Sequence, residues 1–312
     1  MRFDHNKNTK VPYYLRNIIR LFIPGFIYRA KLDRVLKNIV INDYIESRVS
    51  YYNKLNEKFS LPDNANSISD FKKEKKKTYY FDLLEYFRFF DTTKKIMYLF
   101  GDVIDIPKNP SFVKSRPIDG DNKNSVLMKL DKVRHFIYVN DKLEFEEKKG
   151  MAVWRGIAHN LQRQKVIYQY FNHPLCDIAH SRKNDIINND CYRKKMSLNE
   201  QLQFKYILSI EGNDVASNLK WIMSSNSLAF MPKPKYETWF MEGTLIANHH
   251  YVLVNDDFSD LEDKINYYNL HTEEAKKIIS NANKYINQFK NKKTEDEISL
   301  LVLNKYFEKS GQ

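Results

Sequence analysis

Strand-like and helix-like segments alternate between residues 150 and 285, and this alternation constrains the fold more than any other feature of the chain. The strand-like runs lie at 151–156, 205–212, 227–231 and 250–254, and segments with helical spacing lie between them at 159–171, 215–226 and 237–245. Strands that alternate with helices of about ten residues predict right-handed βαβ units and a parallel sheet. Residues 149–285 are therefore expected to form a Rossmann-like domain of the α/β class.

The preceding part of the chain contains strand-like runs of its own, at 97–100 and 135–139. The first of these runs ends at Gly101 and Asp102. It reads as a buried strand that delivers a carboxylate at its carboxyl end, which is the end that faces the ligand crevice in open α/β sheets.

The chain length allows two domains of roughly 150 residues each. Helical spacing recurs near the end of the chain, at 272–289 and 294–310. We therefore expect an N-terminal acceptor-side domain over 1–148, the Rossmann-like nucleotide-sugar-binding domain over 149–285, and a C-terminal helix over 286–312 that could cross back to the N-terminal domain.

The segment at 12–41 combines apolar residues at three and four spacing with a basic polar side, and Pro24 and Gly25 interrupt it. This pattern predicts two short amphipathic helices. Their basic residues are Arg16, Arg20, Arg29, Lys31, Arg34 and Lys37. One interpretation is that the helices lie on an anionic membrane surface. The other is that they pack on the first domain as ordinary surface helices.

The charge of the chain suits an anionic partner. It carries 51 basic and 39 acidic residues, a formal net charge of +12. Nucleic acid, an acidic membrane face and a phosphorylated substrate all fit that charge. The sequence has no zinc-finger spacing, no RNP-like aromatic strand and no Gly-rich clamp, so we expect no nucleic-acid partner.

The cysteines and the N-terminus indicate a cytoplasmic protein without a metal site. Cys176 and Cys191 lack the dense, even spacing of a disulfide framework. His173 and His180 lie at ligand-like spacing from Cys176, but Cys191 has no such neighbour to complete a zinc site. Charged residues interrupt any apolar run at the N-terminus, which predicts neither a signal peptide nor a transmembrane span.

A Rossmann-like domain without a G-x-G-x-x-G fingerprint needs other groups to hold a diphosphate, and cationic side chains are the first choice. Arg155 follows an apolar strand and precedes Gly156, so its planar donor lies at the carboxyl edge of the strand, where it suits phosphate. Arg163 lies two helical turns further on. The alternative for Arg155 is a salt bridge that joins the two domains.

A second candidate for phosphate binding is the loop after Gly212, where a helix N-terminus is expected near Ser217 and Lys220. The alternative is an ordinary strand-turn-helix with a capped helix. Lys114 and Arg116 are further cations in an extended segment. Residues two apart point to the same face of such a segment, unless the following proline bends it and only one reaches the site.

Several of these motifs occur together in the order of a known family. They are VWRG at 153–156, Arg163, KYILSIEGNDVASNLKWIMSSNSLAF at 205–230, the segment from Trp239 to Glu242, and HHYVLV at 249–254. In this order they resemble glycosyltransferase family 90. The family comprises the capsule-associated and lipopolysaccharide A proteins together with the protein O-glucosyltransferases and O-xylosyltransferases. The resemblance spans residues 98–290.

The resemblance implies a GT-B fold, in which two Rossmann-like domains face each other across a cleft. It also implies an inverting, metal-independent transfer from a UDP-sugar bound mainly by the second domain, with no further cofactor. By similarity, Arg155 would contact the phosphate or nucleotide of the donor, and the loop from Gly212 to Lys220 would hold the diphosphate. Eukaryotic members carry an arginine where this chain has Asn218, so Lys220 or Lys114 would have to replace it.

The catalytic base of the family is an aspartate at the end of a strand, a few residues before a proline. The run YLFGDVIDIP resembles this pattern with Asp102 at that position and Asp105 as the second choice. Asp102 could instead be a turn or helix-capping aspartate. A single displacement needs a carboxylate that takes the acceptor proton while cations neutralise the leaving diphosphate. Trp239 and Glu242 could hold the donor sugar, although Trp239 could equally belong to the core.

These inferences predict a glycosyltransferase that moves glucose, xylose or a similar sugar onto a lipopolysaccharide, lipooligosaccharide or capsule acceptor. The acceptor would be an oligosaccharide or a lipid-linked glycan, and the enzyme would be cytoplasmic and peripheral at the inner face of the membrane. A non-catalytic carbohydrate- or nucleotide-binding module and a basic nucleic-acid-binding protein are the alternatives. The joint presence of Asp102, Arg155 and the Gly212 loop favours the enzyme.

Overall fold

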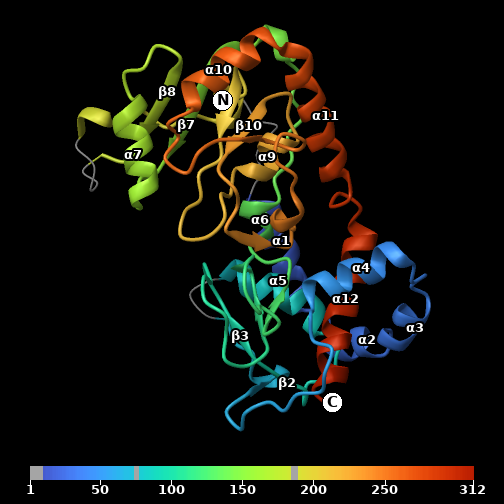
Figure 1. Ribbon diagram of the computed structural model, residues 1–312. Coiled ribbons are helices and arrows are strands. Elements are labelled where there is room, and N and C mark those ends of the chain that lie inside the picture. The colour runs from blue at the N-terminus through green and yellow to red at the C-terminus, as the bar shows by residue number, and fades with distance from the viewer. Residues whose placement is uncertain (1–9, 74–76, 184–188) are drawn as a thin grey trace. The chain divides into compact units, whose positions relative to one another are not determined.

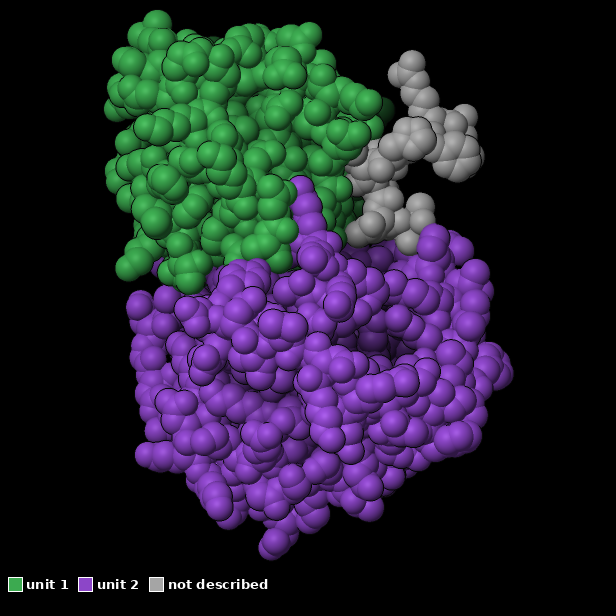
Figure 2. All heavy atoms as spheres, turned by 90° about the vertical axis from the view of Figure 1, so that its right-hand side faces the viewer, with its two compact units in different colours: residues 1–8, 135–234, 243–288 green, residues 9–134, 235–242, 289–312 purple. Residues whose placement is uncertain are grey.

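The computed structural model describes residues 10–73, 77–183 and 189–312. These residues form two compact units, which have different colours in Figure 2. Unit 1 contains the described residues of 135–234 and 243–288, and unit 2 contains all the others. Helices and parallel strands occur in both units, which confirms the predicted α/β class.

Unit 1 is built around a five-stranded sheet in which all neighbouring strands are parallel, as the alternation predicts. The strands are β7 (Lys149–Gly156), β8 (Cys176–His180), β9 (Phe204–Leu208), β10 (Leu228–Met231) and β12 (Val252–Leu253). Their order is β12-β10-β9-β7-β8. After β8 the chain therefore crosses β7 and adds β9 on its other side, and the later strands extend the sheet in that direction.

Helices cover this sheet through apolar faces, and α10 and α11 appear in orange in Figure 1. α7 confirms the predicted helix at 159–171 and buries Val166 and Ile167. α11 confirms the predicted helix at 272–289, whereas α10 lies in a segment for which no helix is predicted. The helices are α7 (Leu161–Tyr170), α8 (Leu198–Gln201), α9 (Leu219–Met223), α10 (Leu261–Leu270) and α11 (Thr272–Asn287), with 3₁₀ turns η2 (Phe145–Glu147) and η3 (Asn189–Cys191).

The strand predicted at 135–139 is wrong. Helix α6 (Lys132–His135) occupies the start of this run, and the residues that follow pair with no strand. The Val139 N–H donates a hydrogen bond to Ser224 Oγ at 2.9 Å, so a side chain satisfies it in place of a neighbouring strand. Phe136 is buried, which means that the apolar run reflects burial alone.

The elements on both sides of Gly212 are shorter than predicted. β9 ends at Leu208 instead of Gly212, and α9 covers only the centre of the predicted helix at 215–226. Asn218 explains the difference, because its Nδ2–H donates to the Leu208 carbonyl at 2.9 Å. The chain between them folds back on the end of the strand and does not continue the helix.

The helix predicted at 237–245 is also wrong. The segment begins with β11 (Tyr236–Thr238), which pairs antiparallel with β5 (Ser115–Pro117), and only the 3₁₀ turn η4 (Glu242–Thr244) follows. The Glu242 carboxylate accepts hydrogen bonds from the Thr238 N–H at 2.6 Å and from Thr238 Oγ1 at 2.9 Å, which replaces helical backbone bonding. Met241 has a φ of 55°, a left-handed conformation that an α-helix excludes.

Unit 2 contains a small parallel sheet and two antiparallel strand pairs. The parallel sheet has the order β3-β4-β6, and β3 confirms the strand predicted at 97–100. Phe112 and Val126 lie opposite each other in this sheet and are completely buried. The strands are β3 (Tyr98–Leu99), β4 (Ser111–Val113) and β6 (Ser125–Leu127), and β1 (Asn66–Ser67) pairs with β2 (Lys95–Ile96).

The amphipathic N-terminal segment forms three helices and not the predicted two. α1 (Lys10–Leu21) ends before Pro24, and the chain continues as α2 (Gly25–Arg29) and α3 (Leu32–Lys37). No helix in the described part of the chain is long and apolar enough to cross a bilayer. The other elements of unit 2 are α4 (Asp43–Tyr52), η1 (Ile68–Asp70), α5 (Lys77–Phe87) and α12 (Lys292–Lys309), the last of which confirms the predicted helix at 294–310.

Candidate functional site

The strand order of unit 1 points to the carboxyl ends of β7 and β9. From β7 the chain proceeds outward to β8, and from β9 it proceeds in the opposite direction to β10. The direction therefore reverses between these two neighbouring strands. Open α/β sheets bind their ligands outside the carboxyl ends of the strands at such a switch point. Both segments predicted to bind the donor lie at this edge. VWRG ends β7, and the loop around Gly212 follows β9.

Two side chains at the start of α7 connect the loops that follow β7 and β9. Asn160 caps the helix and donates its Nδ2–H groups to the carbonyls of Glu211 at 3.1 Å and Gly212 at 2.9 Å. Arg163 donates from Nε to the Glu211 carbonyl at 3.0 Å and from Nη2 to the Ile210 carbonyl at 2.8 Å. The loop around Gly212 is thus held against the first turn of α7.

Further contacts fix the Arg163 guanidinium at this edge. Its Nη1 donates to the Ile157 carbonyl at 3.0 Å, and its Cζ lies 5.4 Å from the centre of the Trp154 ring, at cation–π distance. Because carbonyl groups from both loops orient the guanidinium, Arg163 is a pre-positioned cation at the switch point. Its predicted role as a donor-binding residue stays a prediction.

Gly156 and Gly212 allow these groups to approach each other. A Cβ atom on Gly156 would lie 2.5 Å from Cζ2 of Trp154, and one on Gly212 would lie 3.2 Å from Arg163 Nη2. A side chain at either position would displace the arginine or the ring beneath it. Sequence reasoning missed Asn160, although an asparagine directly before a helical segment is a recognisable cap.

Arg155 takes part in a cluster of charges beside β8. Its Nη2 pairs with the Asp177 carboxylate, and its Nη1 donates to the Asp177 carbonyl at 2.7 Å. Arg193 pairs with the same carboxylate, so two cations share one anion. Burial raises the pKa of Asp177, but the bonds and charges of Arg155 and Arg193 outweigh burial and hold the pKa below its usual range. The salt bridge of Arg155 lies within unit 1, and the cluster retains a net positive charge.

The loop from Gly212 to Lys220 does not gather its polar side chains at one point. Lys220 is completely buried, the Asn218 amide binds the Leu208 carbonyl, and Ser217 is half-buried. α9 begins at Leu219, between Ser217 and Lys220 as expected, although later than the predicted start at 215. Phosphate contacts of Ser217, Asn218 and Lys220 stay predictions, and the burial of Lys220 argues against a direct one.

In unit 2, Asp102 and Lys114 meet beyond the carboxyl ends of two parallel strands. β3 and β4 pair Leu99 with Val113, and Asp102 and Lys114 follow shortly after these residues. Lys114 Nζ lies 2.7 Å from Asp102 Oδ1. The Lys114 side chain is 1% exposed and the Asp102 side chain is 25% exposed, so a buried cation supports a carboxylate that solvent reaches.

The backbone around Asp102 is held in place locally. Gly101 has a φ of 124°, a conformation that favours glycine. Ser115 Oγ accepts the Val103 N–H at 3.2 Å and donates to the Val103 carbonyl at 3.1 Å. Asp105 lies in the exposed loop that follows. Of the two aspartates predicted as the base, Asp102 is the one for which the structure gives an ion pair with a lysine.

Arg116, the second cation predicted in this segment, is completely buried in unit 2. Its Nε pairs with Glu237 Oε1 at 2.7 Å, and its Nη1 donates to the Ser125 carbonyl at 3.0 Å. Only Lys114 of the two predicted cations therefore lies beside Asp102. The break in the segment falls at Lys114, between β4 and β5, and not at the following proline, which lies within β5. Arg116 stabilises the pairing of β5 with β11, because its partner Glu237 lies opposite it in the ladder.

Trp239 and Glu242, predicted as contacts of the donor sugar, are also buried in unit 2. The Trp239 ring stacks on Tyr52 with ring centres 3.8 Å apart, and its Nε1 donates to Glu295 at 2.7 Å. Glu242 is 1% exposed and binds Thr238. These contacts favour the core alternative for Trp239, and contact of either residue with a sugar stays a prediction.

Among the described residues, no group of three or more His, Cys, Asp or Glu side chains is arranged to hold a metal ion. Cys176 and Cys191 are buried free thiols, and burial together with the nearby charge of Glu262 raises the pKa of Cys176 to about 12. His173 pairs with Glu262 at 3.2 Å.

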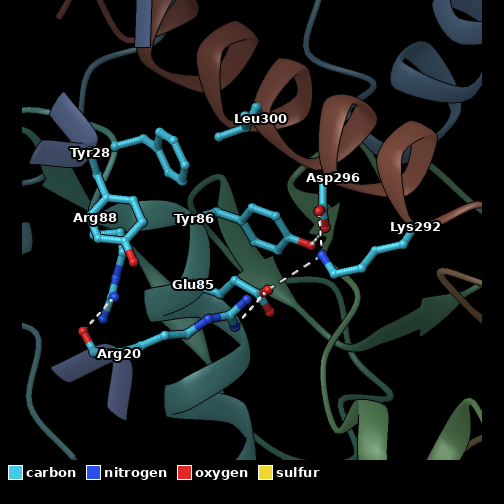
Figure 3. Close-up of a pocket in the computed structure, with 9 residues that line it drawn as sticks. Arg20, Tyr28, Glu85, Tyr86, Arg88, Lys292, Asp296 and Leu300 are labelled. Atoms are coloured by element: carbon cyan, nitrogen blue, oxygen red, sulfur yellow. Dashed lines mark hydrogen bonds and ion pairs between the residues drawn. The ribbon is translucent and has the colours of Figure 1, made fainter. Parts of the chain in front are cut away.

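A pocket in unit 2 lies among α1, α2, α5 and α12, and four of its charged residues form ion pairs with one another (Figure 3). Arg20 Nη1 lies 2.7 Å from Glu85, and Lys292 pairs with Asp296. Burial raises the pKa of Glu85, but Lys132 and Arg20 outweigh burial and lower it to about 2. No predicted site residue contributes to this pocket. Its lining residues are Arg20, Tyr28, Glu85, Tyr86, Arg88, Phe89, Lys292, Asp296 and Leu300.

Comparison with known proteins agrees with the expected family. The model of glycosyl transferase family 90 matches residues 124–308, a range that includes Arg155, Arg163 and Gly212. The O-glucosyltransferase LpsA of Dichelobacter nodosus is 44% identical over 310 residues, which cover 97% of this chain and 96% of that protein. The chain therefore belongs to glycosyltransferase family 90 and is a glycosyltransferase.

Proposed function

We propose that this enzyme transfers glucose from UDP-glucose to a carbohydrate acceptor, with inversion at the anomeric carbon, without a metal ion and with a fold of GT-B type. The relative named as an O-glucosyltransferase supports glucose as the sugar and a hydroxyl oxygen as the acceptor atom. Parallel sheets in each unit support the fold type. The observation that carries the proposal is the pair of cations, Arg155 and Arg163, near the switch point of a parallel sheet.

The diphosphate of the donor would bind beside the first turn of α7. A helix N-terminus attracts an anion through its free N–H groups, and here Arg163 lies on that turn. Protein carbonyls orient Arg163, and Asp177 orients Arg155, so both cations are in position before a ligand arrives. Fixed cations of this kind neutralise the charge that develops on the leaving UDP, which is the task of the divalent ion in metal-dependent transferases.

The transfer would be a single displacement with Asp102 as the base. The Asp102 carboxylate takes the proton of the acceptor hydroxyl while the hydroxyl oxygen forms its bond to the anomeric carbon. The bond from that carbon to the β-phosphate oxygen breaks, and its electron pair leaves with UDP. Lys114, at 2.7 Å, favours the charged form of the carboxylate that a base requires.

The acceptor would be a growing lipopolysaccharide, lipooligosaccharide or capsule chain, in the form of an oligosaccharide or a lipid-linked glycan. A lipid-linked acceptor is presented at a bilayer surface. The enzyme would therefore work as a peripheral protein on the cytoplasmic face of the inner membrane. The formal net charge of +12 supports a location at an anionic surface.

The variant Asp102→Asn tests the chemistry. The amide keeps the shape of the carboxylate but cannot accept the proton, so turnover should fall by about 10² to 10⁴. UDP affinity should stay within about threefold, which is a change of less than 1 kcal/mol in the binding free energy. The matched control is Asp105→Asn in the same loop, which should leave turnover within about threefold.

Release of UDP from UDP-glucose in the presence of acceptor measures turnover, and titration calorimetry measures UDP affinity. If Asp105→Asn abolishes transfer and Asp102→Asn does not, the base is Asp105. If both variants remain active, the base lies outside this loop and the proposed mechanism is wrong. A hydrolysis screen over UDP-sugars without acceptor tests the sugar, and a preference for UDP-xylose would overturn the choice of glucose.

A further inference from the structure

Helix α1 contacts the protein through Tyr13, Asn17 and Arg20, and its aliphatic residues face solvent. The Tyr13 ring also packs with Phe81 and Val133. Tyr13 and Asn17 are buried, and Arg20 on the same side forms an ion pair in unit 2. An amphipathic helix on a globular protein ordinarily buries its apolar stripe. The opposite face of α1 is exposed at Val11 (74%), Leu15 (57%), Ile18 (46%), Ile19 (55%) and, just beyond the helix, Phe22 (83%).

Specific polar contacts with α5 determine this orientation. The Tyr13 hydroxyl donates to Asp82 Oδ1 at 2.8 Å. Arg20 Nη1 lies 2.7 Å from Glu85 Oε1 (Figure 3). Arg88 Nη1, just after α5, donates to the Arg20 carbonyl at 2.8 Å. Because these contacts involve both ends of α1, the exposure of its apolar residues follows from the way the helix is attached.

The exposed apolar residues form one continuous stripe, the apolar face of α1. Its positions 11, 15, 18 and 22 follow the three and four spacing that places side chains on one side of a helix. A helix of 12 residues is about 18 Å long. Phe22 and Phe26, on either side of the Pro24 break, extend the exposed apolar surface into the following turn. Single exposed apolar residues are ordinary, but a stripe of this kind marks an interaction surface.

The charge of the same segment indicates which partner fits this surface. Residues 10–37 contain seven basic residues and one acidic residue, Asp33. Arg16, Lys31 and Arg34 are exposed. A second copy of the chain would bring the same positive charge to the interface and be repelled. An anionic bilayer offers both a negative surface for the basic residues and an apolar layer for the stripe.

We propose that α1 and the turn to α2 are a docking surface for an anionic lipid bilayer. The apolar face of α1 enters the boundary between headgroups and acyl chains, Phe22 and Phe26 insert beside it, and the exposed basic residues of 10–37 contact the anionic headgroups. The inference rests on the proposed function only in the choice of a membrane as the place of the acceptor. It assigns that contact to one face of one helix.

The first test replaces the apolar face in the full-length chain. The combined variant Leu15→Ser, Ile18→Ser and Phe22→Ser should bind mixed phosphatidylglycerol and phosphatidylcholine vesicles at least about tenfold more weakly than the unchanged chain in a sedimentation assay. The matched control is Ile246→Ser with Leu270→Ser, since these side chains are 58% and 82% exposed outside the segment. The control should bind like the unchanged chain.

The second test removes the exposed charges. Each basic residue near an anionic surface contributes about fivefold to binding, so Arg16→Gln, Lys31→Gln and Arg34→Gln together should weaken binding about a hundredfold. Arg20 is left in place because it anchors the helix to Glu85. Binding should fall as salt rises, and pure phosphatidylcholine vesicles should bind poorly.

The outcomes separate this inference from the proposed chemistry. Hydrolysis of UDP-glucose without acceptor should be unchanged in all three variants. If the unchanged chain itself does not hydrolyse UDP-glucose, only the donor proposal is rejected. Equal vesicle binding by the apolar variant and its control would overturn the docking surface. A dimer that the apolar variant dissociates, without any vesicle binding, would assign the face to a second copy of the chain.

Discussion

Replacement of Glu295 by glutamine should lower the free energy of unfolding by about 3 to 5 kcal/mol. Glu295 lies on α12, and its side chain is 3% exposed. Its carboxylate lies 2.7 Å from Arg48 Nη1 and 2.7 Å from Lys129 Nζ. The side chains of these two cations are 2% and 11% exposed, so one buried carboxylate balances two buried cations.

The magnitude follows from these distances. A pair of unit charges 2.7 Å apart attracts by about 6 kcal/mol at an effective dielectric constant of 20. Desolvation of the charges offsets part of this attraction, which leaves a measured loss of about 3 to 5 kcal/mol when one partner of a buried pair is removed. Glutamine keeps an oxygen that can accept the Trp239 Nε1–H bond, so the predicted loss comes from the charge.

The loss should depend on pH in a defined direction. Burial lowers the pKa of Lys129, which the charge of Glu295 opposes. In Glu295→Gln that opposition is gone and the pKa falls further, so the unfolded chain holds its Lys129 proton more tightly than the folded one. The free energy of unfolding of the variant therefore rises with pH between the lowered pKa of Lys129 in the folded chain and its ordinary pKa in the unfolded chain. The difference in stability between the unchanged chain and the variant should be smaller at pH 9 than at pH 6.

Urea unfolding followed by circular dichroism measures the free energy. Glu297→Gln is the matched control on the same helix, because Glu297 pairs with Lys293 at 3.7 Å and Lys293 is 84% exposed. Its effect should be within about 0.5 kcal/mol. A loss below about 1 kcal/mol in Glu295→Gln, or one equal to that of the control, would refute the argument that the cations are desolvated.

UDP at a hundred times its dissociation constant should stabilise the enzyme by about 2.7 kcal/mol in EDTA, and a shift in thermal midpoint that requires manganese would contradict the metal-independent proposal. Arg155→Ala should weaken UDP binding at least about tenfold in calorimetry. The control Arg193→Ala, which loses an ion pair with the same Asp177, should not weaken it. If Arg155→Ala leaves UDP affinity unchanged but lowers the thermal midpoint, the role of Arg155 is structural. Burial raises the pKa of Asp82 to about 7, so the folded chain binds the extra proton and stability should fall by roughly 2 to 3 kcal/mol between pH 5 and pH 8. Asp82→Asn should remove that slope in urea titrations, and a slope that persists would exclude Asp82 as its source.

The sequence predicts several elements from their apolar residues. β7 and β10 are expected from continuous apolar runs and α11 from its helical spacing, and all three lie where they are expected. The failures at 135–139 and 237–245 share a cause, because in both segments side chains satisfy backbone groups. Ser224 does so for Val139, and Glu242 does so for Thr238. Apolar runs there report burial, and burial alone does not distinguish a strand or a helix from irregular chain.

The candidate site was predictable in its residues but not in its assembly. Arg155 and Asp102 stand directly at or after apolar strands, and that position alone marks them as residues of a carboxyl edge. The pairing of β9 with β7, which brings Arg163 to Gly212, is a contact between distant parts of the chain. Lys114 reaches Asp102 only because two strands of two and three residues pair in parallel, and strands so short have too few residues to predict a register.

For the N-terminal helix α1, the spacing of apolar residues in the sequence does not determine which side of the helix faces the protein. Packing and membrane binding both require an apolar stripe on α1, and they differ only in the direction that the stripe faces. That direction is set by α5, where Asp82 and Glu85, three residues apart on one helical face, are 1% and 10% exposed. Buried carboxylates need hydrogen bonds and cations, and Tyr13, 69 residues earlier than Asp82, supplies one while Arg20 supplies the other. Because two carboxylates on α5 require the polar side of α1, its apolar side must face outward.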